Sequence, residues 1–185
     1  MKPLRALVVY ESMFGHTEQL AHAVAEGLAD AGVTVTLTEV SEAPFGIPRE
    51  VDLLVVGAPT HAFSLSRPNT RSEAVRKGAL ASRQPLGLRE WLSSVSGTNG
   101  VGVAVFDTRR AKVRRLPLAA GPLAAKIARR RGLVLLSKPV GFVVNGTKGP
   151  LRSDQLERAA AWGSLVADVA RGHVVVTERA RQRVS

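Results

Sequence analysis

A short polar segment between an apolar run and a helical pattern carries residue types that bind phosphate. Ser12 and Thr17 supply hydroxyl groups, and Gly15 lets the backbone approach a ligand closely. A helix that begins beside them adds backbone N–H groups, and its dipole favours an anion. We therefore expect a phosphate-binding loop at this point. Its members are Ser12, Met13, Phe14, Gly15, His16 and Thr17.

This loop differs from two common nucleotide-binding motifs. It has neither the Gly-Lys-Ser/Thr of the P-loop nor the G-x-G-x-x-G of dinucleotide-binding domains. Taken alone, it leaves a second interpretation open, because Ser12 and Thr17 are also residue types that cap a helix without binding a ligand. The neighbouring elements must decide between the two.

Strands and helices are expected to alternate around this loop. Apolar runs rich in β-branched residues predict strands, and apolar residues at helical spacing predict helices. The expected strands cover residues 4–10, 33–40, 51–57 and 101–106, with 133–136 and 140–144 forming one interrupted fifth strand. The expected helices cover residues 17–31, 72–81, 88–95, 122–131 and 153–171. We expect a long functional loop over 58–71 and a basic loop over 107–116.

This alternation predicts an α/β fold with right-handed crossovers and helices on both faces of a parallel sheet. Five strands fit a doubly wound sheet in the order 2-1-3-4-5, a three-layer sandwich. In such sheets, ligands bind outside the carboxyl ends of the strands, near the switch point between strands one and three. We expect one domain over residues 1–172 and a basic, partly frayed tail over 173–185.

The first loop also resembles the FMN-phosphate signature of the flavodoxin family. That signature combines an apolar pair, an aromatic residue, a hydroxyl residue, a small residue and a threonine. The matching residues are Val8, Val9, Tyr10, Ser12, Gly15 and Thr17, with Ala21 in the helix and Ala23 where the family often has an aliphatic residue. Residues 149–163 resemble the start of the final helix of bacterial flavodoxin-domain proteins, so the resemblance covers nearly the whole chain.

Two later segments resemble the flavin loops of this family. The resemblance implies that they bind the cofactor, flavin mononucleotide (FMN), together with the phosphate loop. The residues implied after the third strand are Pro59, Thr60, His61, Ala62 and Phe63, and those after the fourth are Phe106, Asp107, Thr108 and Arg109. For Asp107, a role as a helix or turn cap stays open. No residue is assigned a catalytic role.

The resemblance implies a redox protein that transfers electrons through FMN. Two forms stay open, an electron carrier and a small reductase that depends on NAD(P)H or quinone. In both, the flavin carries the redox chemistry, and the protein sets its binding and electrostatics. The expected partner is a redox protein or a small-molecule electron donor or acceptor.

The chain departs from electron-carrier flavodoxins in its charge and in its aromatic residues. Those carriers are acidic and stack the flavin between aromatic rings, whereas this chain has a net charge of +11. Its two tryptophans, Trp91 and Trp162, fall in expected helices, where we expect them in the core. The available ring partners are His61, Phe63 and Phe14.

Composition excludes several other chemistries. The chain has no cysteine, which removes disulfides and thiolate metal sites and fits a reducing cytoplasm. Its four histidines lack metal-ligand spacing, so no metal site is expected. The apolar run near the N-terminus is too short for a signal peptide or a membrane span.

The positive charge lies almost entirely in the later part of the chain. Residues 1–70 hold four Lys/Arg and eight Asp/Glu, whereas residues 71–185 hold 22 and seven. This asymmetry supports an alternative from another class, a basic protein that keeps the fold, does not use flavin and binds nucleic acid or an acidic protein. Nucleic acid is the less expected partner, because no helix-turn-helix, zinc finger or aromatic-rich RNA surface is apparent.

Overall fold

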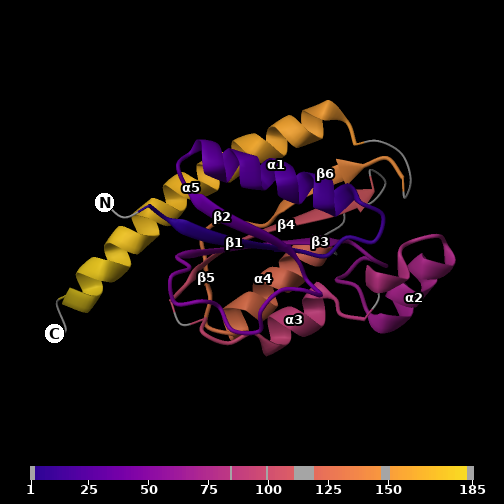
Figure 1. Cartoon of the computed structure of the whole chain (residues 1–185), viewed down its shortest axis with the longest axis horizontal. Coiled ribbons are helices and arrows are strands. Elements are labelled where there is room, and N and C mark those ends of the chain that lie inside the picture. Colours follow the sequence, from indigo (N-terminus) through magenta and orange to yellow (C-terminus); the bar gives the residue numbers. More distant parts are fainter. Residues whose placement is uncertain (1–2, 84, 99, 111–118, 147–150, 183–185) are drawn as a thin grey trace.

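A parallel β-sheet lies between two layers of helices in the computed structural model (Figure 1). The structure describes residues 3–83, 85–98, 100–110, 119–146 and 151–182. The strands are β1 (Arg5–Tyr10), β2 (Thr34–Glu39), β3 (Leu53–Pro59), β4 (Gly102–Arg110), β5 (Val134–Leu135) and β6 (Val140–Val144). The helices are α1 (His16–Asp30), α2 (Pro68–Arg76), α3 (Leu88–Ser94), α4 (Ala120–Arg130) and α5 (Ser153–Gln182), with a 3₁₀ turn at Ala81–Arg83.

The sheet confirms the predicted strand order and adds a sixth strand. The order is β2-β1-β3-β4-β5, all pairs are parallel, and β6 also pairs with β4. The interrupted fifth strand is therefore two strands. Val134 and Leu135 pair with the start of β4, and Val140–Val144 pair with its end. The break falls at Lys138 and Pro139, where proline removes a ladder hydrogen bond.

Two hydrophobic cores hold the layers together. Side chains alternate between the faces of each strand, so Val8 faces α1 and α5 while Val9 faces α3 and α4. On the first face, α1 and α5 pack closely, because glycines lie at their contact. A Cβ on Gly27 would lie 1.9 Å from the carbonyl oxygen of Ala160, and one on Gly163 would lie 2.4 Å from that of Val24. The two helices thus meet backbone to backbone.

The second core contains the first tryptophan. Trp91 of α3 is fully buried and donates from its indole nitrogen to the carbonyl oxygen of Pro44, at 3.2 Å. Trp162 of α5 is buried in the first core. The expectation that both tryptophans are core residues is confirmed.

Three element boundaries differ from those expected. Helix α2 begins at Pro68, inside the expected loop, where proline suits the first helical position and the Thr70 hydroxyl accepts from the Arg67 N–H at 2.9 Å. Strand β4 continues through Arg110, so the basic loop expected from residue 107 starts later, and residues 111–118 lie outside the described part of the chain. Helix α5 continues past residue 171 to Gln182 as regular helix rather than a frayed tail.

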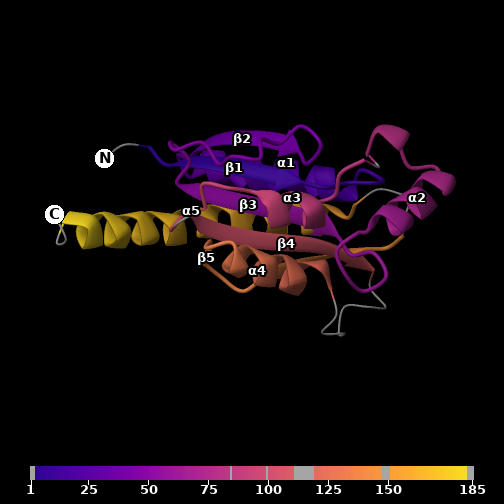
Figure 2. The same cartoon turned by 90° about the horizontal axis from the view of Figure 1, so that it is seen from below.

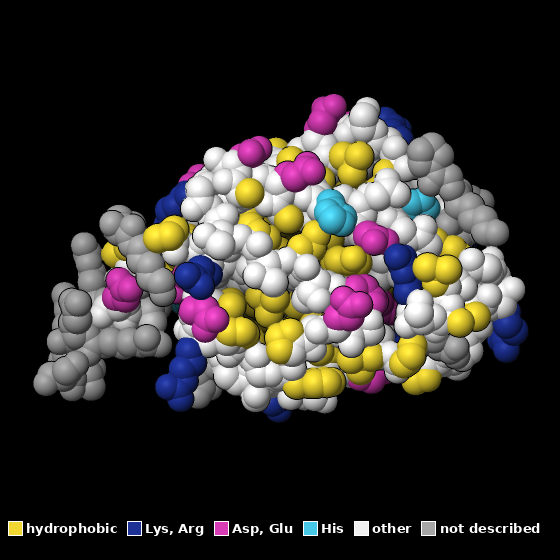
Figure 3. Space-filling model, in the orientation of Figure 1, with side chains coloured by type: hydrophobic (Ala, Val, Ile, Leu, Met, Phe, Trp, Pro, Cys, Tyr) yellow, Lys and Arg dark blue, Asp and Glu magenta, His cyan; other side chains and the backbone are white. Residues whose placement is uncertain are grey.

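Helix α5 runs beyond the body of the molecule, away from the end where the strands finish (Figure 2). No helix among the described residues is long and apolar enough to cross a membrane. On the face shown in Figure 3, acidic and basic side chains are interspersed. The excess of arginine in the sequence therefore does not form a continuous basic surface on that face.

Candidate functional site

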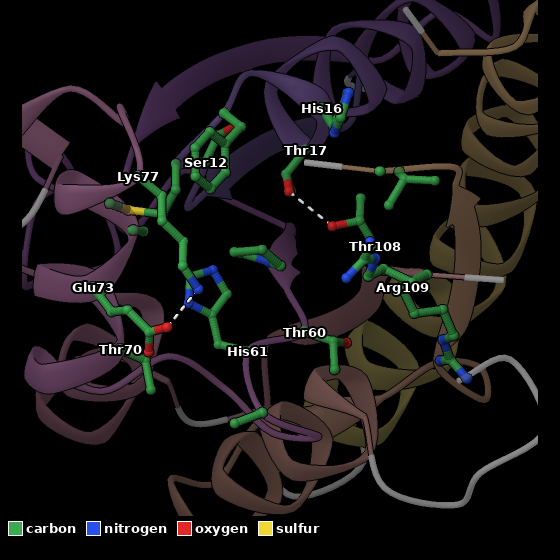
Figure 4. Close-up of a pocket in the computed structure, with 18 residues that line it drawn as sticks. Ser12, His16, Thr17, Thr60, His61, Thr70, Glu73, Lys77, Thr108 and Arg109 are labelled. Carbon is green, nitrogen blue, oxygen red and sulfur yellow. Dashed lines mark hydrogen bonds and ion pairs between the residues drawn. The ribbon is translucent and has the colours of Figure 1, made fainter. Parts of the chain in front are cut away.

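A cavity of about 320 Å³ opens at the carboxyl edge of the sheet, between the loops that follow β1 and β3 and the end of β4. Helix α2 forms a further wall (Figure 4). Its lining residues are Ser12, Met13, Phe14, His16, Thr17, Pro59, Thr60, His61, Ala62, Thr70, Glu73, Ala74, Lys77, Thr108, Arg109, Arg110, Val144 and Gly146. This is the edge at which ligands bind in doubly wound sheets.

The loop after β1 leads directly into the N-terminus of α1. Gly15 precedes the helix with a φ of +91°, a left-handed conformation that suits glycine. Its N–H donates to Ser12 Oγ at 3.1 Å, which closes the loop on itself. The first N–H groups of a helix have no acceptors within that helix. The loop therefore presents backbone donors and the positive end of the α1 dipole to the cavity.

Two hydroxyl groups meet beside this helix start, one from α1 and one from the end of β4. Thr17 Oγ1 lies 3.2 Å from Thr108 Oγ1, and both residues are buried. The N–H of Thr60 donates to the carbonyl oxygen of Thr108 at 2.8 Å. Figure 4 shows Thr17 and Thr108 pointing toward one another, with Thr60 further along the cavity. Elements far apart in the sequence thus bring their polar side chains to one place.

A tight turn after β3 forms a second part of the wall. His61 and Ser64 exchange two backbone hydrogen bonds, of 2.8 and 3.0 Å. Between them, Ala62 and Phe63 have φ angles of +46° and +64°. Two successive positive φ values define a type I′ turn, which normally contains glycine or asparagine. His61 and Ala62 line the cavity, whereas the Phe63 side chain stands at the surface, 50% exposed.

Helix α2 contributes residues to which the sequence assigned no role. Thr70, Glu73, Ala74 and Lys77 line the cavity, and Lys77 forms an ion pair with Glu73. Figure 4 shows Thr70, Glu73 and Lys77 on the same side of the cavity as His61. The sequence offered the signal for an earlier helix start, namely Pro68, which suits the first helical position, and Thr70 two residues later, whose hydroxyl can accept from the N–H of the capping residue.

The pKa of His61 is lowered from its usual value. Burial is the main cause, and the positive charge of Arg71 acts in the same direction. The backbone at Thr70 and the carboxylate of Glu73 oppose the shift. His61 is therefore neutral at pH 7 and presents an uncharged imidazole to the cavity.

At the end of β4, Asp107, Arg109 and Arg110 have different roles, because the first two form an ion pair. Arg109 donates to buried Asp107 through Nε and Nη2, at 2.7 and 2.6 Å. Asp107 also accepts from the Gly121 N–H at 3.0 Å, so it caps the start of α4. The cap interpretation of its side chain is the one that the structure supports. Arg109 lines the cavity with its charge largely balanced, while Arg110 is exposed at the cavity edge.

Phe106 lies in the core rather than in the cavity wall. Its ring packs edge-on against Phe142 and Trp162, with centroids 6.0 and 5.9 Å away. The ring also covers Gly57, where a Cβ would lie 2.1 Å from Phe106 Cζ. This side chain supports the sheet beneath the cavity, because the strand points it to the opposite face.

The structure thus brings together most of the residues predicted for the site. Those that line the cavity are Ser12, Met13, Phe14, His16, Thr17, Pro59, Thr60, His61, Ala62, Thr108 and Arg109. Those that do not line it are Gly15, Phe63, Phe106 and Asp107, which respectively shape the loop, stand at the surface, fill the core and cap α4.

The donor set fits a flavin that carries a phosphate. One end of the cavity has the α1 N-terminus and threonine hydroxyls, which suit an anion. The apolar walls, which suit a flat ring, are formed by Met13, Phe14, Pro59, Ala62, Ala74 and Val144. No group of three metal-ligating side chains occurs among the described residues.

Comparison with known families and proteins agrees with this geometry. The family model described as Flavodoxin matches residues 8–106. A relative named NAD(P)H dehydrogenase (quinone) from Bradyrhizobium diazoefficiens is 49% identical over 47 residues, which are 25% of this chain and 22% of the relative. A protein of the same name from Rhizobium rhizogenes is 37% identical over 76 residues, covering 30% of this chain and 38% of the relative. The chain thus matches well under half of the length of these relatives.

Solved structures show the same fold. A flavodoxin from the domain Archaea superposes with a TM-score of 0.63 at 17% identity, covering 91% of this chain and 99% of that one. A WrbA-like flavodoxin from Agrobacterium tumefaciens superposes with a TM-score of 0.59 at 22% identity, covering 92% and 99%. At these identities the likeness concerns the architecture of the sheet and its helices.

Proposed function

The chain belongs to the flavodoxin family, which binds flavin, and from this premise we propose that it holds FMN in the cavity and uses it to transfer electrons. The flavin-binding unit that we propose is residues 1–172, with residues 173–185 as an appended basic segment. A cytoplasmic location, which fits the absence of cysteine, is part of the same proposal.

One observation carries this proposal, the meeting of the start of α1, the end of β4 and the loop after β3 at one cavity. The hydroxyls of Thr17 and Thr108 lie 3.2 Å apart at the helix N-terminus, next to an apolar chamber. A phosphate needs several donors aimed at one point, and a flavin ring needs flat apolar walls. The alternative of a flavin-free basic protein explains the charge of the chain but gives no reason for this convergence.

When bound, the flavin supplies the capacity to take up and release one or two electrons. The chain's own residues bind and orient it. The loop Ser12–Thr17 holds the phosphate, and His61 and Ala62 border the ring on one side. Thr108 and Arg109 border it on the other, where Asp107 keeps the added charge of Arg109 small.

Both an electron carrier and a reductase remain within this proposal. The partner is a redox protein or a small electron donor or acceptor. NAD(P)H and quinone are the first small molecules to test, because they appear in the names of two relatives. The wall formed by α2 leaves the polar groups of Glu73 and Lys77 facing the cavity, where a second small molecule could be oriented.

Reconstitution of the purified chain tests the proposal. The chain is mixed with FMN and, separately, with riboflavin, which lacks the phosphate, and binding is followed by flavin fluorescence and absorbance. We expect FMN to bind more tightly than riboflavin by about tenfold or more, because charge-assisted hydrogen bonds to a phosphate are strong. Equal affinity for the two would overturn the phosphate site, and no binding of either would overturn the function.

Anaerobic titration of the FMN-loaded chain then separates the two forms. A reductase is reduced directly by NADH or NADPH and is reoxidised by a quinone within seconds. A carrier exchanges electrons with a reduced protein partner or a chemical reductant but not with the nicotinamides. The absorbance of the flavin reports both outcomes.

A further inference from the structure

The turn after β3 holds two residues in a conformation that they disfavour. Ala62 and Phe63 have φ angles of +46° and +64°, in the left-handed region that costs side chains with a Cβ. Such backbone strain persists only where the surrounding structure imposes it. Neither Ala62 nor Phe63 is buried, so packing of their side chains does not impose it. Contacts elsewhere on the loop must do so.

One arginine from another helix binds the irregular segment that leaves this turn. Arg89 of α3 donates through Nε to the carbonyl oxygen of Ser66 at 3.0 Å. Its Nη2 donates to Ser64 Oγ at 3.0 Å and to the carbonyl oxygen of Leu65 at 2.9 Å. Three consecutive residues are thus held by one planar guanidinium, starting at the last residue of the turn.

A second arginine holds the same segment from α2. Buried Arg71 donates through Nη1 to Ser66 Oγ at 2.9 Å and to Glu90 Oε2 at 3.1 Å. Leu65 and Ser66 are fully buried between these contacts. Arg71 therefore anchors the far end of the segment, while Arg89 is the group that reaches back to the turn itself.

We propose that Arg89 is a positioning residue for the flavin site: it imposes the strained turn and so keeps His61 and Ala62 in the cavity wall. The expected effect on flavin binding rests on the proposed flavin function. The hydrogen bonds of Arg89 to Ser64, Leu65 and Ser66, which we call the clamp, do not depend on a flavin. Lysine cannot replace this arginine, because a guanidinium offers several donors in a fixed plane and an ammonium does not. Charge alone is therefore insufficient at this position.

The proposal makes the effect of losing Arg89 depend on the residue at position 62. Without the clamp, Ala62 and Phe63 can relax toward negative φ, which moves the wall of the cavity. Glycine adopts positive φ without this cost. Ala62→Gly should therefore lower the dependence of the turn on Arg89, whereas it would not help if Arg89 only supported α3.

The experiment combines Arg89→Lys, Arg89→Ala and Ala62→Gly, with Arg76→Ala as a control that removes an exposed arginine from α2. Hydrogen exchange of the His61 and Ser64 amides, which bond across the turn, is measured without flavin. We expect both Arg89 variants to speed this exchange by about tenfold. We expect FMN to bind about tenfold more weakly to them, because a wall of the site loses its fixed geometry.

In the Arg89→Ala variant, adding Ala62→Gly should slow the amide exchange and tighten FMN binding by roughly twofold to fivefold each. This is the gain expected when glycine replaces another residue at a strained position. Unchanged amide exchange in both Arg89 variants would overturn the clamp. So would full FMN affinity in Arg89→Lys, or an absence of recovery with Ala62→Gly. If the unmodified chain does not bind FMN, the proposed function fails, while amide exchange still decides whether Arg89 holds the turn.

Discussion

The cavity is bounded by two loops that reach unusual backbone angles in different ways. The loop after β1 places a glycine, Gly15, at a φ of +91° and closes through its own Ser12. The turn after β3 places Ala62 and Phe63 at positive φ and is held by arginines of α2 and α3. The first loop reaches positive φ at a glycine and takes an outside contact from Arg83, whose Nη1 donates to the Ser12 carbonyl oxygen at 3.1 Å. The second reaches positive φ at residues with a Cβ, and the segment that leaves it is bound by Arg71 and Arg89.

This difference decides what each loop tolerates. Because glycine adopts positive φ at little cost, we expect the first loop to depend mainly on its own residues. A turn that is held by side chains of other elements should also respond to substitutions in those elements. Substitutions can therefore test the contrast directly.

We expect the largest effect from Thr17→Val in the first loop. The variant removes a buried hydroxyl at the α1 N-terminus while keeping a similar shape, so FMN affinity should fall by about 1.5–3 kcal/mol, as for hydrogen bonds to charged groups. Titration of flavin fluorescence gives this value. Thr34→Val, at an exposed position of β2, serves as the matched control and should bind normally. An unchanged dissociation constant for Thr17→Val would remove the phosphate from this loop.

A smaller effect on FMN affinity should distinguish the two ring side chains of the second loop, His61 and Phe63. His61 lines the cavity and Phe63 does not, so His61→Ala should cost about 0.5–1.5 kcal/mol of FMN affinity, the typical worth of an aromatic contact. Phe63→Ala should cost less, although the flavin-loop resemblance alone would make the two equal. A larger loss for Phe63→Ala, or a changed flavin spectrum in that variant, would show that the turn closes over the ring when flavin binds.

The two loops should also respond to pH in opposite directions. Burial lowers the pKa of His61 below its usual 6.5, so the unfolded chain binds the extra proton and the free energy of unfolding falls as the pH drops below about 6.5. Burial raises the pKa of Glu11, next to the first loop, above its usual 4.5. The folded chain then holds the extra proton, and the free energy of unfolding falls as the pH rises above 4.5.

Chemical denaturation across this pH range checks both signs. His61→Gln should remove the loss of stability on the acidic side. Glu11→Gln should remove the loss on rising pH, while its amide oxygen can still accept from the Leu88 N–H, as Glu11 Oε2 does at 2.8 Å. Either variant with the slope of the original chain would show that another group causes the dependence.

The smallest effect should come from Arg110, at the edge of the cavity. The sequence suggests that Arg109 and Arg110 raise the potential for the second electron and attract acidic or phosphorylated partners. In the structure, Arg109 is balanced by Asp107, so only the exposed Arg110 adds charge, and exposed charges contribute about 0–1 kcal/mol. Arg110→Ala should lower this potential slightly, and less at high salt. Potentiometry that finds no change at low salt would leave Arg110 without a role in tuning.

The fold and the first loop were predictable, because their causes are local. Apolar runs such as 51–57 and the hydroxyl and glycine spacing around Gly15 appear in the sequence itself. The sequence predicted one interrupted fifth strand rather than two strands. No local signal shows that β4, with its nine residues, is long enough to pair with two short strands one after the other. Phe106 was also assigned to the site on its resemblance to a flavin loop, whereas the alternation of the expected strand 101–106 places it with Ala104 in the first core.

The second loop shows where local reasoning ends. Nothing near Ala62 and Phe63 indicates positive φ, since neither residue is a glycine or an asparagine. The turn is bound by Arg89, which the sequence places in an expected helix, and Arg71, at the end of the expected loop 58–71, holds the far end of the same segment. The α2 wall was missed for a related reason, because the segment before Arg71 reads as irregular.

The projecting end of α5 has a practical consequence. The last turns of α5 lie at the end of the molecule opposite the carboxyl ends of the strands (Figure 1), where the cavity-lining residues are found. A chain tethered to an electrode through its C-terminal end would turn the cavity mouth toward the solution. The helix would then serve as a built-in spacer, and the orientation of the immobilised protein would be set by its own architecture rather than by surface chemistry.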